Sequence, residues 1–154
     1  GALLDRTPRF ISGVTTAPCH FVIIERLVPT MATTKINLQC DVPVRDIVCA
    51  AIRDYACAAY PEGGSDCAQV ARSALLDLAA QIEAGINEGC DAVLISRRPR
   101  AMVKAAFAWY YDRLDAEQGG DSTHQRECLQ SLLHEQSVRR ADLAAARAAD
   151  HALT

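Results

Sequence analysis

The chain has few aromatic residues and no long hydrophobic segment. Aromatic residues make up 5% of its 154 residues, whereas hydrophobic residues as a group make up 50%. A core built mainly from Ala, Leu, Val and Ile suits closely packed helices better than a β-sandwich. No apolar run approaches the roughly 20 residues of a membrane span, and the apolar stretch 21–24 is too short for the core of a signal peptide. We therefore expect a helical cytoplasmic protein that does not enter a membrane.

Recognisable catalytic and cofactor motifs are also missing. The sequence has no GxSxG, Walker or dinucleotide-binding pattern. His124, Cys128 and Glu135 recur at intervals that suit one helix face, but they lack the CxxC or HExxH spacing of a strong metal site. We therefore expect no enzyme activity, no cofactor and no metal.

The cysteines and the net charge bear on the cellular compartment of the protein and on its binding to nucleic acid. Seven cysteines at irregular spacing do not suggest a disulfide framework. Cys40, Cys49 and Cys57 sit in patterns typical of strand or helix cores, so we interpret them as small buried hydrophobes in a reducing compartment. The net charge of −3 opposes non-specific binding to nucleic acid, although it allows a local basic stripe.

Three segments are expected along the chain. Proline and glycine interrupt residues 1–30, and Met31 follows them, so this segment is either a native N-terminal arm or a non-native extension. Residues 31–85 read as one small domain, and residues 86–154 as a helical C-terminal region.

Residues 31–85 predict one strand and two helices. Residues 35–40 alternate polar and apolar side chains, which is typical of a strand. Asp41 as a helix cap and Pro43 in the first turn predict a helix of roughly 17 residues that stops at the Pro-Glu-Gly-Gly turn 61–64. Ser65 or Asp66 then caps a second helix, which ends near Gly85.

Residues 86–154 predict a helical hairpin. The apolar run 92–95 is either a strand or a buried connector, and a helix follows near 99–117. The pair Gly119-Gly120 breaks that helix, and an Ala- and Arg-rich helix is expected over about 122–150. Its first half should pack on the preceding helix, while the part beyond Arg139 should be weakly held and available to a protein partner.

The strand 35–40 has no evident partner in its own chain. A lone strand leaves its backbone groups unpaired, and the most economical partner is the same strand of a second copy. The segment 34–84 then resembles the ribbon-helix-helix family, that of the Arc and methionine repressors. The resemblance rests on the alternating strand 35–39, the Gly63-Gly64-Ser65 turn and the run 70–75. The resemblance implies a mainly α homodimer, in which one short strand and two helices precede the C-terminal hairpin.

This resemblance implies sequence-specific binding of double-stranded DNA by a transcriptional regulator or a DNA-processing accessory factor. The outward strand residues Lys35, Asn37 and Gln39 would read bases in the major groove, and Ser65 would lie near a phosphate. The densest positive cluster provides three more DNA-contact candidates, Arg97, Arg98 and Arg100, with Lys104 one turn further on. The alternative, which is slightly favoured, is a solvated surface on which these arginines pair with Asp91 or Glu88.

Two alternatives stay open. The alternating strand also suits the edge of a small α+β domain that binds no nucleic acid. The acidic balance and the Ala-rich helices also suit a non-enzymatic helical module that binds protein, such as a phage or mobile-element accessory protein. Asp66 favours these alternatives, because it places a negative charge where the phosphate would dock.

Overall fold

Strand β1 (Lys35–Cys40) begins the part of the chain that the computed structural model describes, residues 34–153. Its side chains alternate along the strand, with Ile36, Leu38 and Cys40 buried and the residues between them half-buried. This confirms the predicted strand and its inward face. The segment 1–30 and the proposed start at Met31 lie outside the described residues.

β1 is the central strand of a three-stranded sheet of order β2-β1-β3. β2 (Ala92–Ser96) pairs antiparallel with residues 35–39, and β3 (Ser137–Val138) pairs parallel with the last two residues of β1. The prediction that β1 lacks a partner in its own chain is therefore wrong. Both neighbours come from segments far along the chain, so pairing the β1 backbone does not require a second copy.

Two helices follow β1 as predicted. α4 (Val42–Ala59) begins after Asp41, whose carboxylate accepts a hydrogen bond from the Val44 amide at 3.3 Å, and Pro43 lies in its first turn. α5 (Asp66–Gly85) begins after Ser65, whose hydroxyl accepts from the Ala68 amide at 3.2 Å. These caps satisfy amides that have no partner inside the helix.

The C-terminal half departs from the predicted hairpin. α6 (Arg100–Gln118) and its break at Gly119 agree with the prediction. The single helix expected over 122–150 is wrong, because that region divides into α7 (Thr123–Gln130), a 3-10 turn η2 (Ser131–His134), β3 and α8 (Arg140–Leu153). The Ser131 hydroxyl donates to the Cys128 carbonyl at 2.6 Å, and Glu135 adopts a left-handed backbone with φ of 62°. Both features end the helical hydrogen-bond pattern.

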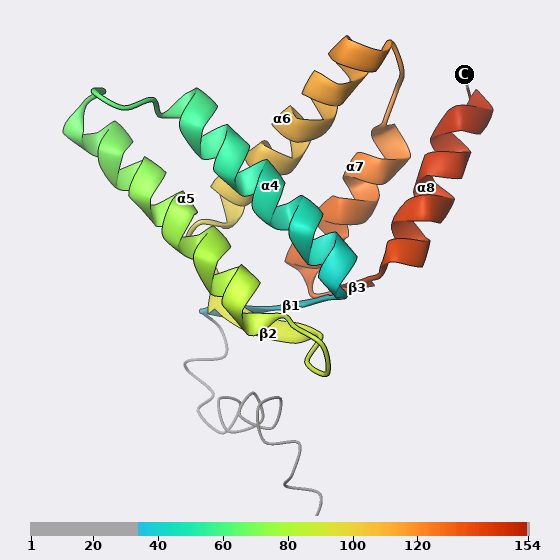
Figure 1. Ribbon diagram of the computed structural model, residues 1–154, viewed down its shortest axis with the longest axis horizontal. Coiled ribbons are helices and arrows are strands. Elements are labelled where there is room, and N and C mark those ends of the chain that lie inside the picture. The colour runs from blue at the N-terminus through green and yellow to red at the C-terminus, as the bar shows by residue number, and fades with distance from the viewer. Residues whose placement is uncertain (1–33, 154) are drawn as a thin grey trace, which may run out of the picture. The chain divides into compact units, whose positions relative to one another are not determined.

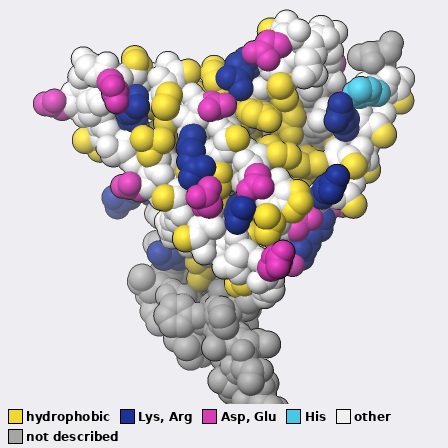
Figure 2. Space-filling view, viewed as in Figure 1, with side chains coloured by type: hydrophobic (Ala, Val, Ile, Leu, Met, Phe, Trp, Pro, Cys, Tyr) yellow, Lys and Arg dark blue, Asp and Glu magenta, His cyan; other side chains and the backbone are white. Residues whose placement is uncertain are grey.

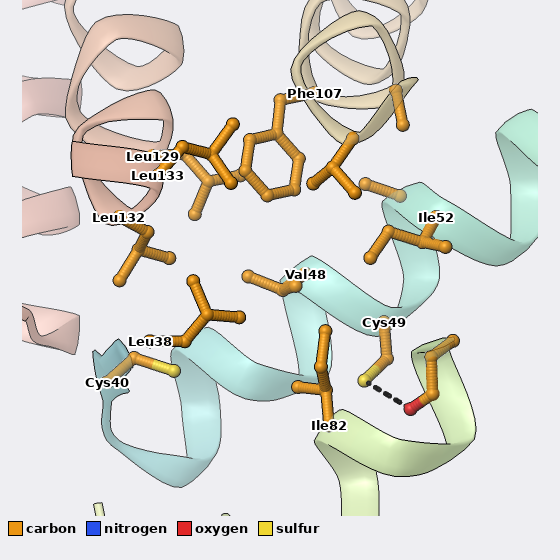
Figure 3. Close-up of a cluster of buried hydrophobic side chains, with 14 of the residues drawn as sticks. Leu38, Cys40, Val48, Cys49, Ile52, Ile82, Phe107, Leu129, Leu132 and Leu133 are labelled. Atoms are coloured by element: carbon orange, nitrogen blue, oxygen red, sulfur yellow. Dashed lines mark hydrogen bonds between the residues drawn. The ribbon is translucent and has the colours of Figure 1, made fainter. Parts of the chain in front are cut away.

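One core joins all these elements. α4 lies between α5 on one side and α6 and α7 on the other, and the sheet covers one end of the helices (Figure 1). Phe107 of α6 lies beside Leu129 and Leu133, while Val48 and Ile52 of α4 face it (Figure 3). Residues 34–154 form one compact unit, so the boundary expected at residue 85 falls inside it. No helix in residues 34–153 is long and apolar enough to cross a bilayer.

The cysteines divide between core and surface. Cys40 and Cys49 are buried as predicted, and the Cys49 thiol lies 3.4 Å from the Ala79 carbonyl (Figure 3). Burial raises the pKa of the Cys40 thiol to about 12, which keeps it protonated. The prediction for Cys57 is wrong, because its side chain is exposed on α4.

α8 is fastened to α7 through one buried carboxylate. Asp150 is 3% exposed and accepts hydrogen bonds from the backbone amides of His124 and Gln125 at 2.7 and 3.0 Å. The side chains of the same two residues also bond it, at 2.8 and 3.0 Å. The expectation that the chain beyond Arg139 is weakly held is therefore wrong. Asp150 caps the N-terminus of α7, and α8 packs along that helix.

Replacing Gly85 with Ala should destabilise the fold, because a Cβ there would clash with Val93 Cβ and Cγ2. We expect Gly85→Ala to lower the free energy of unfolding by about 1–2 kcal/mol, since Val93 is branched and cannot move aside freely. Urea denaturation measures the change. Gly120→Ala is the control, because nothing lies within 4 Å of a Cβ there. Adding Val93→Ala to Gly85→Ala should recover part of the loss, and a fully stable Gly85→Ala variant would contradict this packing.

Removing the charge of Asp150 should also destabilise the fold at neutral pH. Burial alone would raise the pKa of this carboxyl, but the hydrogen bonds from His124 and Gln125 outweigh burial and lower the pKa to about 2. The stabilisation is therefore complete above the unfolded pKa, about 3.9, and is lost as the pH falls toward 2. We expect Asp150→Asn to lower the free energy of unfolding at pH 7 by about 2 kcal/mol.

Denaturation at several pH values tests this expectation. The gap between wild type and Asp150→Asn should narrow steadily below pH 4. Asp77→Asn is the matched control, because Asp77 is exposed on α5 and forms no hydrogen bond or salt bridge with residues 34–153. An equal gap at pH 7 and pH 3 would show that the carboxylate charge does not fasten α8.

Candidate nucleic-acid interface

The register of the sheet brings two predicted groups of DNA-contact residues to one place. β1 and β2 run antiparallel with Lys35 opposite Ser96, so the start of β1 lies beside the loop that follows β2. That loop carries Arg97 and Arg98, and α6 begins at Arg100. We call the five cations at this end of the sheet the basic corner: Lys35, Arg97, Arg98, Arg100 and Lys104.

Backbone hydrogen bonds hold the basic corner in place. The Arg97 amide donates to the Thr34 carbonyl at 2.9 Å, and the Arg97 guanidinium donates to the Lys35 carbonyl at 3.4 Å. The Arg98 amide donates to the Ser96 hydroxyl at 3.2 Å. These bonds join the first residues of β1 to the loop after β2, so the cations stand on a defined backbone.

The start of α6 adds a second positive feature. Its N-cap is Pro99, and no side chain caps the helix. The Arg100 amide donates to the Arg97 carbonyl at 3.1 Å, and the amides of residues 101 and 102 that follow keep their partial positive charge for an outside acceptor. Arg100 and Lys104 lie on the adjacent turns and line a small cavity of about 180 Å³ together with His134. The Arg100 guanidinium lies 2.9 Å from His134 Nδ1, which fixes its direction.

The basic corner is a cluster of unpaired cations, whereas most other arginines of residues 34–153 are paired; of the rest, only Arg140 and Arg147 on α8 also lack a salt bridge within that range. None of its five cations forms a salt bridge with a residue of the described range 34–153. Six arginines elsewhere in that range do form salt bridges with carboxylates: Arg45, Arg53, Arg72, Arg113, Arg126 and Arg139. Unpaired like charges on neighbouring residues repel one another, so this corner gains most from an added anion.

The outer face of β1 is less free than the sequence indicates. The Gln39 side-chain amide donates to the Glu135 carbonyl at 3.3 Å, and the Asn37 backbone amide donates to the Glu135 carboxylate at 2.9 Å. The Asn37 side-chain oxygen is shielded from solvent and has no hydrogen-bond partner. The Lys35 ammonium group forms no salt bridge with the described residues 34–153, so of the three proposed base readers it is the most available.

Ser65 lies away from these residues. It caps α5 at the α4–α5 turn, which is at the opposite end of α5 from the sheet (Figure 1). Its hydroxyl already accepts from the Ala68 amide. The structure therefore brings Lys35, Arg97, Arg98 and Arg100 together and leaves Ser65 out.

Sequence reasoning missed His134 as a neighbour of this cluster. It lies 34 residues from Arg100 in the chain, and only the turn η2 returns it to α6. No local pattern signals that contact. His124 and Cys128, considered above for a metal, lie on α7, where His124 bonds Asp150; residues 34–153 contain no cluster of potential metal ligands.

Comparison of the chain with known protein families, with curated proteins and with solved structures gives no match. The functional argument therefore rests on the geometry of the residues themselves.

Proposed function

We propose that this protein binds double-stranded DNA in a sequence-dependent way, through the β1–β2 ribbon and the basic corner. The observation that carries the proposal is the group of five cations that form no salt bridge with residues 34–153, in a chain whose net charge is −3. A localised positive group on an acidic protein directs a polyanion to one place.

The β1–β2 ribbon supports the same proposal. A two-stranded ribbon has the width to enter a major groove, and here one chain supplies both strands. Lys35 at the end of this ribbon can donate to the acceptors of guanine, and Asn37 and Gln39 share its face of β1. Arg97 and Arg98 follow directly and would hold the flanking phosphates, together with the uncapped start of α6.

A regulatory or DNA-processing role would follow from such binding. The expectation of a homodimer rests on an unpaired β1. Because β1 is paired on both edges in its own chain, that reason no longer holds. DNA binding through one ribbon does not need a second copy. Two copies on a symmetric site would have to associate through another surface.

Fluorescence anisotropy with a labelled DNA duplex tests the proposal across a range of salt concentrations. The logarithm of the binding constant should fall linearly with the logarithm of salt concentration, by about 0.9 for each phosphate contact. Arg97→Gln/Arg98→Gln should make that slope shallower by about 2, since two phosphate contacts are lost. Lys35→Gln should reduce discrimination between duplex sequences, by about 1–3 kcal/mol at the base it reads.

The control is Arg140→Gln/Arg147→Gln, which removes two exposed arginines of α8 and the same total charge. Its salt slope should match that of the wild type. The proposal fails if the wild type does not bind duplex DNA at low salt, or if the two double variants lower the slope equally. An equal effect would mean that net charge, and not the basic corner, attracts the DNA.

A second candidate function is a helical module that binds protein. It is favoured by Val70 of α5, a large hydrophobic side chain that is 69% exposed. Acidic and basic side chains are also interspersed on the face in Figure 2, without a continuous positive field. This function predicts that Val70→Ser abolishes capture of a protein partner while DNA binding stays unchanged.

A further inference from the structure

A cavity of about 440 Å³ lies at the opposite end of α6 from the basic corner. α4, the last turns of α6 and α8, and the start of α7 form its walls. The space-filling view shows hydrophobic side chains in the hollow between the ends of α6 and α8 (Figure 2). Its volume is within the range of small-molecule sites, about 300–1,000 Å³.

Three carboxylates line this cavity, and each is held rigidly by its own chain. Asp115 accepts from the Ser122 hydroxyl at 2.6 Å and the Ser122 amide at 3.0 Å. Asp121 accepts from the amide and the hydroxyl of Thr123. Asp150 accepts the four bonds that fasten α8 to α7. These bonds orient the carboxylates but leave their negative charges in place.

Tyr111 supplies an independent sign that the cavity holds something. It is 3% exposed and lines the cavity from α6. Its hydroxyl makes no hydrogen bond to any residue in the described part of the chain. A hydroxyl that has no partner in the chain, at the wall of a cavity, is free to exchange hydrogen bonds with a molecule inside the cavity. Burial raises the pKa of Tyr111, so the hydroxyl stays neutral and can accept a hydrogen bond as well as donate one.

The charge of the walls selects the sign of the ligand. Three carboxylates face two basic side chains, the Arg147 guanidinium and the His151 imidazole, which both lie exposed on α8. The C-terminal ends of α6 and α8 lie at the cavity with the negative ends of their dipoles, and Asp150 offsets the positive end of α7, whose first amides donate to it. Ile47, Leu114 and the Tyr110 ring complete the wall with apolar surface, and an aromatic face attracts a cation.

We propose that this cavity binds a small organic cation, an ammonium group on an apolar body. The ammonium would donate to the Tyr111 hydroxyl and lie in the field of Asp115 and Asp150. The apolar body would contact Leu114 and Ile47. This site is separate from the basic corner and does not depend on DNA binding.

Three probes of one shape test the sign of the ligand: 2-phenylethylammonium, 2-phenylethanol and phenylacetate. Amide resonances of the ¹⁵N-labelled chain are followed as each probe is added to about 10 mM, which detects binding in the millimolar range. We expect the cation to shift resonances of residues 110–125 and 147–151, and phenylacetate to bind about tenfold more weakly or not at all. Equal binding of the two, or no shift with any probe, overturns the proposal.

Two variants test the roles of Tyr111 and Arg147, and they should change the affinity for the cation in opposite directions. Tyr111→Phe keeps the ring and should weaken binding of the cation about tenfold, the equivalent of about 1.4 kcal/mol. Arg147→Gln removes the opposing charge on the rim and should strengthen it, an effect that a purely structural residue would not produce. Tyr60→Phe is the control, because the Tyr60 hydroxyl contacts Met102 Sδ at 3.9 Å away from the cavity. Stronger binding by Tyr111→Phe, or weaker binding by Arg147→Gln, would contradict the assignment.

Discussion

The pairing of β1 on both edges is the constraint on which the rest of this structure depends. β2 pairs with one edge of β1 and β3 with the other. The Asn37 amide of β1 donates a hydrogen bond to the Glu135 carboxylate. Backbone groups buried without partners are costly, so the chain must return to β1 twice. The first return positions α6, and the second divides the C-terminal region into α7 and α8. The order of the helices around α4 follows from these two returns.

The same pairing creates the basic corner. Lys35 and Arg97 are far apart in the sequence, and the register of β1 with β2 makes them neighbours. Their mutual repulsion is tolerated because backbone hydrogen bonds hold the loop, and because their side chains are accessible to counter-ions. Folding holds these positive charges close together before any anion binds, because the backbone hydrogen bonds fix the loop that carries them.

The end of α6 away from the basic corner carries negative charge. There, Asp150 closes α8 onto α7, and hydrogen bonds from His124 and Gln125 make its ionised form the stable one. Asp115 holds the α6–α7 turn by accepting hydrogen bonds from the Ser122 hydroxyl and amide. Structural carboxylates thus leave a negative cavity at one end of α6, while its uncapped start carries the cations. The helix joins two surfaces of opposite charge.

Short local patterns in the sequence determined the helix starts, the helix end and the strand that depend only on neighbouring residues. The alternation of residues 35–40, the Asp41 cap and the break at Gly119 agree with the structure, and of the two candidate caps Ser65 and Asp66 the structure uses Ser65. A side chain and the nearby backbone settle each of these features. The strand partners, the break after Gln130 and the burial of Asp150 depend on contacts with residues far along the chain. Local propensity favours a continuous helix there, and the energy of pairing β3 with β1 and of burying Val138 outweighs it. The sequence by itself therefore determined the strand, the first two helices and the cationic residues of the candidate site, whereas only the tertiary structure decided which of those residues meet, because that depends on long-range pairing.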